Sequence, residues 1–261
     1  MIGAIAGDII GSVYEHNPHK SEVFPLFSEY SCLTDDTVMS LAIAQAILNG
    51  GDYGKEMKSL GRIFPNAGYG GNFFIWISED EIKPYNSWGN GSAMRVSPIG
   101  FAFDTEEDVL REAKNSAQVS HDHPEGIKGA QAVALAILLA RQGANKNQIR
   151  DRISREFKYD LNRTIELIRP GYSFDVSCQG SVPEGIIAFL DSTDYTSAVR
   201  KAVSLGGDSD TLACIAGAIA EAYYKKIPSL IQIETEDRLP GLLWTILESF
   251  EKRFPCCELG A

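Results

Sequence analysis

Two short segments of the chain combine carboxylates with threonine hydroxyls, and each lies directly before an apolar stretch. Residues 34–37 read Thr-Asp-Asp-Thr, and residues 208–211 read Asp-Ser-Asp-Thr. One such side chain is enough to cap the first turn of a helix, so helix capping is the simplest interpretation of each segment. Two carboxylates per segment repel each other unless a cation neutralises them, which favours a metal site over capping alone. Hard oxygen ligands suit Mg²⁺ or Mn²⁺ rather than zinc. The predicted ligands are Thr34, Asp35, Asp36, Asp208, Asp210 and Thr211.

A loop of small residues at 87–92, with the sequence Ser-Trp-Gly-Asn-Gly-Ser, is a second candidate element. It leads into a predicted helix at 93–103, and amides at the start of a helix can approach a diphosphate closely. From the sequence alone, an ordinary turn explains the loop equally well. Trp88 within it either stacks on a ring of the ligand or packs against the protein.

Other polar residues lie where a ligand pocket would need them. Two glycines at 206–207 allow a tight turn before the second acidic segment. His121 and His123 flank Asp122, but no third soft ligand is nearby. Contact with a ligand, or capping of the next helix, is therefore predicted for these histidines rather than metal binding.

The elements that must position these residues are helices. Residues 38–48, 127–139 and 212–222 are apolar nearly all round, as in the middle of a helical bundle. Amphipathic segments at 106–120, 198–203 and 242–250 are predicted to cover them. Only residues 73–77 resemble a strand, and no alternation of strands and helices occurs, so an all-α fold is predicted. The long irregular stretch at 64–98 is predicted to be functional. No linker is evident, so residues 1–261 are expected to form one domain.

Composition excludes several classes of protein. The formal net charge is −11, from 24 basic and 35 acidic residues, which opposes a nucleic-acid surface and docking on anionic membranes. The five cysteines are scattered and form no CxxC pair, which favours reduced thiols in a cytosol. The N-terminus does not resemble a signal peptide, and no apolar run spans a bilayer. A soluble cytoplasmic monomer is expected.

Five motifs, in order, resemble the ADP-ribosylglycohydrolase family, which includes the dinitrogenase reductase-activating glycohydrolases. They are residues 7–11 (GDIIG) with Glu15, residues 34–37 (TDDT), residues 89–95 (GNGSAMR), His121 within 119–121 (VSH), and residues 206–211 (GGDSDT). The resemblance covers nearly the whole chain. It implies a compact, orthogonal multi-helix bundle with two Mg²⁺ or Mn²⁺ ions at the base of an ADP-ribose cleft.

The resemblance also implies roles for single residues. The six predicted ligands match the two metal-binding motifs of the family, and Glu15 matches an acidic residue that can cover the metals. His121 matches a histidine near the distal ribose. The glycine-rich loop of the cleft is matched by Gly68 and Gly70, and the diphosphate loop by Ser87, Trp88, Gly89, Asn90, Gly91 and Ser92. No role carries over to residues 122–124, and the wall on the adenine side matches no motif.

The expected reaction is hydrolysis of the N- or O-glycosidic bond between ADP-ribose and a modified protein or small molecule. Metals would position the ribose and a water molecule, and Asp208 or Glu15 would handle the proton. The sequence does not choose between these two carboxylates, and the leaving group stays open among arginine, serine, a nucleobase or a free compound.

Three alternatives fit less well. A prenyl-diphosphate enzyme needs a carboxylate three residues after Asp36, where Met39 stands. A haloacid-dehalogenase-like phosphatase needs a strand before Asp208, and a helix followed by two glycines is predicted there. A non-catalytic ADP-ribose-binding or structural relative is disfavoured because every predicted ligand is intact.

Overall fold

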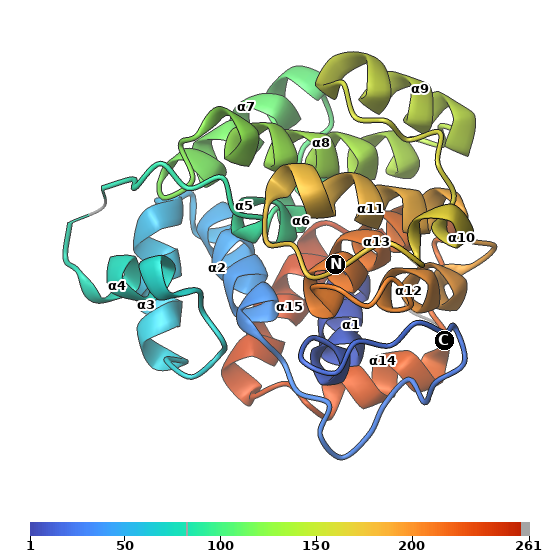
Figure 1. The fold of residues 1–261 in the computed structure, drawn as a ribbon. Helices are drawn as coiled ribbons and strands as arrows, with labels where there is room; N and C mark the ends of the chain where they lie inside the picture. Colours follow the sequence, from blue (N-terminus) through green and yellow to red (C-terminus); the bar gives the residue numbers. More distant parts are fainter. Residues whose placement is uncertain (82, 257–261) are drawn as a thin grey trace.

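The computed structural model describes residues 1–81 and 83–256, and this part of the chain is helical without a named strand (Figure 1). The prediction of an all-α fold is confirmed. The helices are α1 (Ile2–Gly11), η1 (Ser12–Tyr14), α2 (Asp35–Asn49), α3 (Tyr53–Ile63), α4 (Gly71–Ser78), α5 (Gly91–Met94), α6 (Ser97–Ala102), α7 (Glu106–Gln118), α8 (Pro124–Arg141), α9 (Lys146–Phe157), α10 (Ile165–Ile168), α11 (Cys178–Leu190), α12 (Tyr195–Val203), α13 (Ser209–Tyr224), α14 (Ser229–Glu236) and α15 (Gly241–Arg253).

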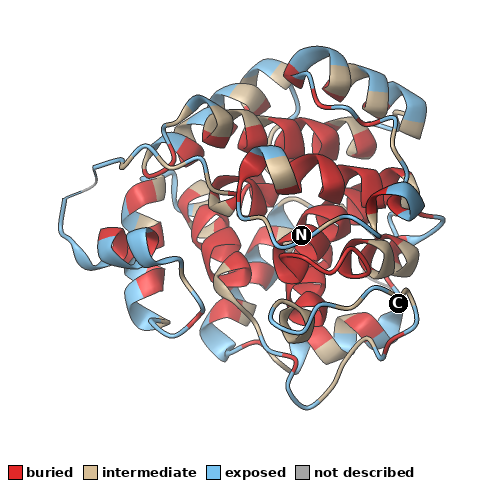
Figure 2. Cartoon of the chain, viewed as in Figure 1, coloured by how far each residue is buried: buried red, intermediate tan, exposed pale blue. Residues whose placement is uncertain are grey.

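The centre of the bundle is α13, which packs against α1, α8, α11 and α12. Figure 2 shows the buried residues concentrated on these central helices, with exposed residues on the outer ones. The three segments predicted to be apolar all round lie in α2, α8 and α13. No helix of the described residues combines the length and the apolarity that crossing a membrane requires.

A stripe of small residues lets α1 lie unusually close to α13. Gly3, Gly7 and Gly11 are spaced four residues apart, so they share one face of α1. A Cβ atom added at Gly7 would lie 2.1 Å from the carbonyl oxygen of Ala213, and one at Gly11 would lie 2.4 Å from that of Ser209. Any side chain at these positions would separate the two helices. The contact therefore places the C-terminal half of α1 beside the start of α13.

Two expectations for the stretch at 64–98 were wrong. Residues 73–77 lie in the helix α4, where Phe73, Trp76 and Ile77 are buried at helical spacing. The helix expected at 93–103 is broken into the short α5 and α6. Short apolar runs do not distinguish a strand from a buried helix, and here helix packing decides, because Ile77 contacts Gly61 of α3.

Candidate metal centre and ligand cleft

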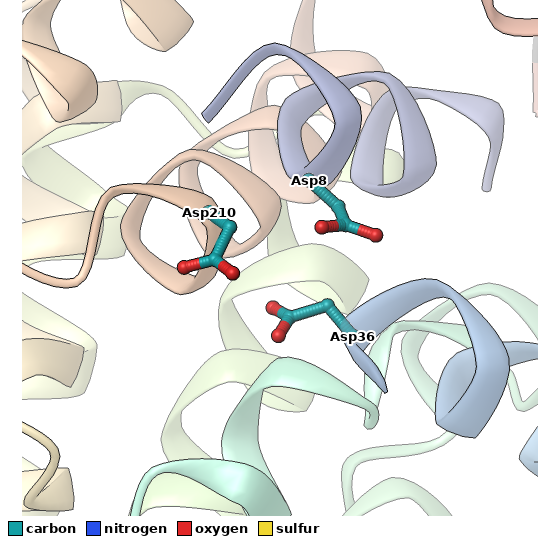
Figure 3. A group of neighbouring side chains, drawn as sticks. All are labelled: Asp8, Asp36 and Asp210. Carbon is teal, nitrogen blue, oxygen red and sulfur yellow. The ribbon is translucent and has the colours of Figure 1, made fainter. Parts of the chain in front are cut away.

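Three helices bring carboxylates to one point near the centre of the molecule. Asp8 of α1, Asp36 of α2 and Asp210 of α13 each offer an oxygen atom, and these atoms lie within 4.8 Å of one another (Figure 3). Glu15, Asp208 and Asp210 form a second group with the same spacing. Asp210 belongs to both groups, so the two acidic segments singled out in the sequence meet at this residue.

Asp8 is a member of the cluster for which the sequence analysis assigned no ligand role. Its Oδ2 accepts hydrogen bonds from the amides of Thr34 (3.0 Å) and Thr37 (3.1 Å) and from the Thr37 hydroxyl, and its Oδ1 accepts from the Thr34 hydroxyl (2.7 Å). These four bonds fasten the start of α2 to α1. The signal in the sequence was a single aspartate inside an otherwise apolar helix, since a buried charge needs several partners.

Asp36 presents an unsatisfied oxygen to the cluster. Its Oδ2 accepts from the Thr211 hydroxyl at 3.2 Å, whereas its buried Oδ1 has no hydrogen-bond partner among the described residues. A buried carboxylate oxygen without a donor is costly unless a cation binds it. Together with the hard oxygen atoms of Asp210 and Thr211, this atom fits a Mg²⁺ or Mn²⁺ ion.

The electrostatics of the cluster also favour cation binding. Burial raises the pKa of Asp8 to about 7, and the neighbouring Asp210 adds to this increase. Burial followed by the charge of Asp210 also raises the pKa values of Asp35, Asp36 and Asp208 well above the ordinary range. Among the described residues, no lysine or arginine forms an ion pair with the four buried members of the two groups, Asp8, Asp36, Asp208 and Asp210. An external cation would neutralise them.

Glu15 and Asp208, the two candidate proton-transfer residues, lie together but in different surroundings. Glu15 follows η1 and keeps 28% of its side chain exposed. Burial and the charge of Asp210 raise its pKa. Asp208 is buried, and its Oδ2 accepts a 2.7 Å hydrogen bond from the Asn90 side chain.

A cavity of about 510 Å³ opens beside the carboxylates and is lined by Asp35, Asp36, Asp208 and Thr211 at this end. The predicted ligand-binding residues in its wall are Gly68, Gly70, Ser87, Trp88, Gly89, Asn90, Gly91 and His121. Gly68 adopts a φ of +95° close to the Asp35 carboxylate, a conformation that favours glycine. The wall therefore joins the acidic cluster to both glycine-containing loops.

Four predicted residues stand outside this wall: Glu15, Thr34, Ser92 and Asp210. The Ser92 hydroxyl is buried and donates a 2.7 Å hydrogen bond to the Gly126 carbonyl. Thr34 serves as the N-cap of α2, and Glu15 and Asp210 belong to the second group of carboxylates. The structure thus places Ser92 as a support of the 87–92 loop.

The 87–92 loop is held by the strand-like segment before α11. The Asn90 amide donates to the Val176 carbonyl (2.8 Å), and the Cys178 amide donates to the Trp88 carbonyl (3.0 Å). These contacts form an isolated antiparallel bridge between Gly89 and Ser177. The loop is therefore positioned by long-range contacts, in addition to the short helix α5 that follows it.

The other residues of the wall were missed by the sequence analysis: Gly71, Asn72, Phe73, Tyr85, Asn86, Met94, Arg95 and Val176. The rings of Phe73 and Tyr85 lie 6.1 Å and 5.8 Å from the His121 ring, measured between centroids. Phe73 was not recognised because its segment was interpreted as a strand. Tyr85 and Val176 lie in loops without motifs, where the sequence gives no signal.

The two histidines after α7 have different roles. His121 lines the cavity, and burial, with the charge of Arg95, lowers its pKa well below the ordinary value. His123 is the N-cap of α8, because its Nδ1 accepts from the Glu125 amide at 3.1 Å. The prediction of helix capping is confirmed for His123.

Comparison with known proteins defines the class to which this site belongs. The sequence model of the ADP-ribosylglycohydrolase family matches residues 1–253. ADP-ribosylhydrolase ARH3 of Bos taurus is 28% identical and that of Homo sapiens 27%; each alignment covers 86% of this chain, and 83% and 84% of the relatives. A solved structure titled "ADP-ribosylglycohydrolase-related protein complex" has the same fold, with a TM-score of 0.74, 23% identity, and coverage of 97% of this chain and 96% of that one.

These matches define a helical glycosidase that hydrolyses ADP-ribose linkages. The chain belongs to the ADP-ribosylglycohydrolase family.

Proposed function

We propose that this protein reverses mono-ADP-ribosylation, hydrolysing the glycosidic bond between ADP-ribose and a modified target with the help of two Mg²⁺ or Mn²⁺ ions. The observation that carries the proposal is the buried Oδ1 of Asp36, which has no hydrogen-bond partner among the described residues. It belongs to the carboxylate cluster beside the cavity of about 510 Å³. The chemistry of the donors supports a pair of hard cations, and the cavity has the volume expected for a nucleotide-sized ligand.

The residues proposed to hold the ions are those of the two acidic helix starts. They are Thr34, Asp35 and Asp36 before and within α2, and Asp208, Asp210 and Thr211 before and within α13. When bound, the ions would neutralise the carboxylates, orient the ribose hydroxyls and acidify a water molecule. The short contacts of Asp8 with Thr34 and Thr37 favour a supporting role for Asp8.

Glu15 is proposed to handle the proton, with Asp208 as the other candidate. Its exposed fraction lets it exchange protons with solvent, as a group that alternates between acid and base must. Asp208 is less free to do so because Asn90 holds one of its oxygen atoms. Asn90 therefore connects the 87–92 loop to the second acidic segment.

The remaining cavity wall is proposed to bind ADP-ribose. The 87–91 backbone and its glycines would accommodate the diphosphate, and His121 would lie near the distal ribose. Phe73, Tyr85 and Trp88 offer aromatic surfaces on which a ring of the ligand can pack. The leaving group is expected to be set by the loops at the mouth of the cavity.

The test is turnover of one purified sample on arginine-linked, serine-linked and base-linked ADP-ribose, with release of ADP-ribose measured by chromatography. At least one substrate should be cleaved, EDTA should abolish cleavage, and Mg²⁺ or Mn²⁺ should restore it. Full turnover in EDTA at near-zero metal content would overturn the metal mechanism. Tight ADP-ribose binding without cleavage of any substrate would indicate a non-catalytic reader.

A further inference from the structure

Arg95 is a fully buried guanidinium group at the end of α5, and among the described residues no carboxylate forms an ion pair with it. Its Nη2 donates two hydrogen bonds, one to the Ser116 carbonyl (3.1 Å) and one to the Ser120 hydroxyl (3.0 Å). Its Nε and Nη1 have no partner in the described part of the chain. A buried charge of this kind is costly, so its retention beside the ligand cavity calls for a function.

The direction of the second hydrogen bond is fixed because a guanidinium group has no acceptor. The Ser120 oxygen therefore accepts from Arg95, and the single hydroxyl proton of Ser120 must go elsewhere. Ser120 is fully buried, and the other side-chain contact of its oxygen is the Nδ1 atom of His121, at 2.8 Å. A hydrogen bond from the Ser120 hydroxyl to Nδ1 gives this proton an acceptor.

The opposite arrangement would leave a group unsatisfied. If Nδ1 carried the proton, Ser120 would accept from both Arg95 and His121, and its own hydroxyl proton would find no acceptor among the described residues. An unpaired buried donor costs about 1–3 kcal/mol. Double protonation of the ring is opposed by its burial and by the positive charge of Arg95. The remaining protonation state is the neutral ring, in which Nδ1 carries no proton and Nε2 carries one.

The Nε2 atom of this ring faces the 87–92 loop. A Cβ atom added at Gly91 would lie 3.0 Å from Nε2, and one added at Gly89 would lie 3.6 Å from it. The rings of Phe73 and Tyr85 flank the imidazole and restrict its rotation. Nε2 has no hydrogen-bond partner among the residues that the structure describes, so its proton is available to a ligand in the cavity.

We propose that Arg95 and Ser120 form a relay that holds His121 as the Nε2–H tautomer, so that this nitrogen donates a hydrogen bond to an oxygen atom of the ligand beside Gly89 and Gly91. Arg95 and Ser120 are positioning residues that act through His121. The ligand's identity as ADP-ribose rests on the proposed function, whereas the tautomer is a property of the protein without ligand.

The direct test is nuclear magnetic resonance of protein labelled with ¹⁵N-histidine, using long-range proton–nitrogen correlations. The chain has four histidines, and loss of one set of signals in His121→Gln assigns His121. The unliganded wild type should show a protonated Nε2 and a bare Nδ1. Detection of the Nδ1–H tautomer or of an imidazolium at neutral pH would overturn the proposal. This measurement uses the wild-type protein, so it does not depend on whether variants of Arg95 or Ser120 fold.

Variants of the relay test its effect on binding. Ser120→Ala should release the tautomer preference and weaken ADP-ribose binding by roughly three- to tenfold, the value of one hydrogen bond, as measured by calorimetry. Ser120→Thr retains the hydroxyl and should restore the Nε2–H tautomer. The matched control is Ser116→Ala, which removes a buried hydroxyl one turn earlier that donates to Ala113 rather than to the relay. It should leave the His121 signals unchanged.

The outcomes separate this proposal from the proposed function. If His121 is the Nε2–H tautomer but ADP-ribose does not bind the wild type, the relay stands and the ligand assignment fails. If ADP-ribose binds and Ser120→Ala changes neither the tautomer nor the affinity, the relay is wrong and the ligand assignment stands.

Discussion

The starts of α2 and α13 share a pattern of aspartate and threonine in the sequence, yet they are stabilised in different ways. At α2, the Thr34 hydroxyl accepts from the Asp36 amide (3.3 Å) and donates to Asp8, so this helix start has its own cap and a brace from α1. At α13, the N-cap residue Asp208 makes no capping bond, and its side chain binds Asn90 instead. The first acidic segment therefore combines a local cap with a brace from α1, whereas the Asp208 side chain of the second is held by a distant contact alone.

The distant contacts at α13 extend to the turn that precedes it. Gly206 has a φ of +62°, and a Cβ atom at Gly207 would lie 2.4 Å from the ring of Tyr172. The Lys20 ammonium group donates to the carbonyls of Arg169 (2.9 Å), Tyr172 and Leu205 around this turn. Two similar carboxylate motifs are thus positioned in different ways, the first by a cap and a brace from α1, the second by the packing of remote loops.

The largest expected effect follows removal of charge from the cluster that the two helix starts share. Asp210→Asn should lower hydrolysis by orders of magnitude and reduce the thermal stabilisation by Mg²⁺, because Asp210 belongs to both groups. Asp35→Asn, on the α2 side alone, should also impair hydrolysis. The metal-free variants should be no less stable than wild type, since repulsion is relieved. Turnover and melting with and without Mg²⁺ measure these effects.

Asp237→Asn at the exposed end of α14 is the control for these variants. Wild-type turnover together with an unchanged Mg²⁺-induced shift in both Asp210→Asn and Asp35→Asn would show that neither residue takes part in metal binding.

The stability of the metal-free protein should depend on pH through the carboxylates at both helix starts. In the folded protein the pKa of Asp8 is raised to about 7, and those of Asp35, Asp36 and Asp208 are also raised. The folded state therefore binds more protons than the unfolded chain, so stability in EDTA should fall as pH rises from about 4 to about 7. Stabilisation by Mg²⁺ should grow over the same range, because protons compete with the ion.

Asp210→Asn should flatten the pH dependence of melting in EDTA, because the charge of Asp210 contributes to each of these shifts. A metal-free stability that rises through this pH range would contradict the electrostatic description of the cluster.

A smaller effect is expected from loosening the turn before α13. Lys20→Met removes three hydrogen bonds from a charged donor and should cost about 1.5–3 kcal/mol in the free energy of unfolding. Displacement of Asp208 should lower kcat by roughly ten- to a hundredfold. Lys55→Met, at an exposed lysine of α3, is the matched control. Equal kcat values for the two variants would exclude Lys20 as a support of this turn.

The smallest effect separates the capped helix start from the uncapped one. Thr34→Ala should cost about 1 kcal/mol in denaturant unfolding in EDTA, because it removes the cap of α2 and one bond to Asp8. Asp208→Asn should cost less, since Asp208 caps nothing and an amide can still bond to Asn90. A larger loss in Asp208→Asn than in Thr34→Ala would reverse the comparison.

The helical class and the central helices could be predicted from the sequence, because apolar periodicity and capping residues act within a few residues of one another. The sequence also singled out both acidic segments by their paired carboxylates, whereas the roles expected for the 87–92 loop and His121 followed from the family resemblance. It misassigned residues 73–77, where five apolar residues fit either a strand or a buried helix.

Which of these residues meet depends on the packing of the helices. The close approach of Gly7 and Gly11 to α13 carries Asp8 to Asp210, although 202 positions separate the two aspartates in the chain. The partnerless oxygen of Asp36, the bond from Asn90 to Asp208, and the contacts of Arg95 through Ser120 to His121 all join residues from different elements. Such contacts depend on how helices pack, and one sequence records the small residues that permit this packing but not the partners that it brings together.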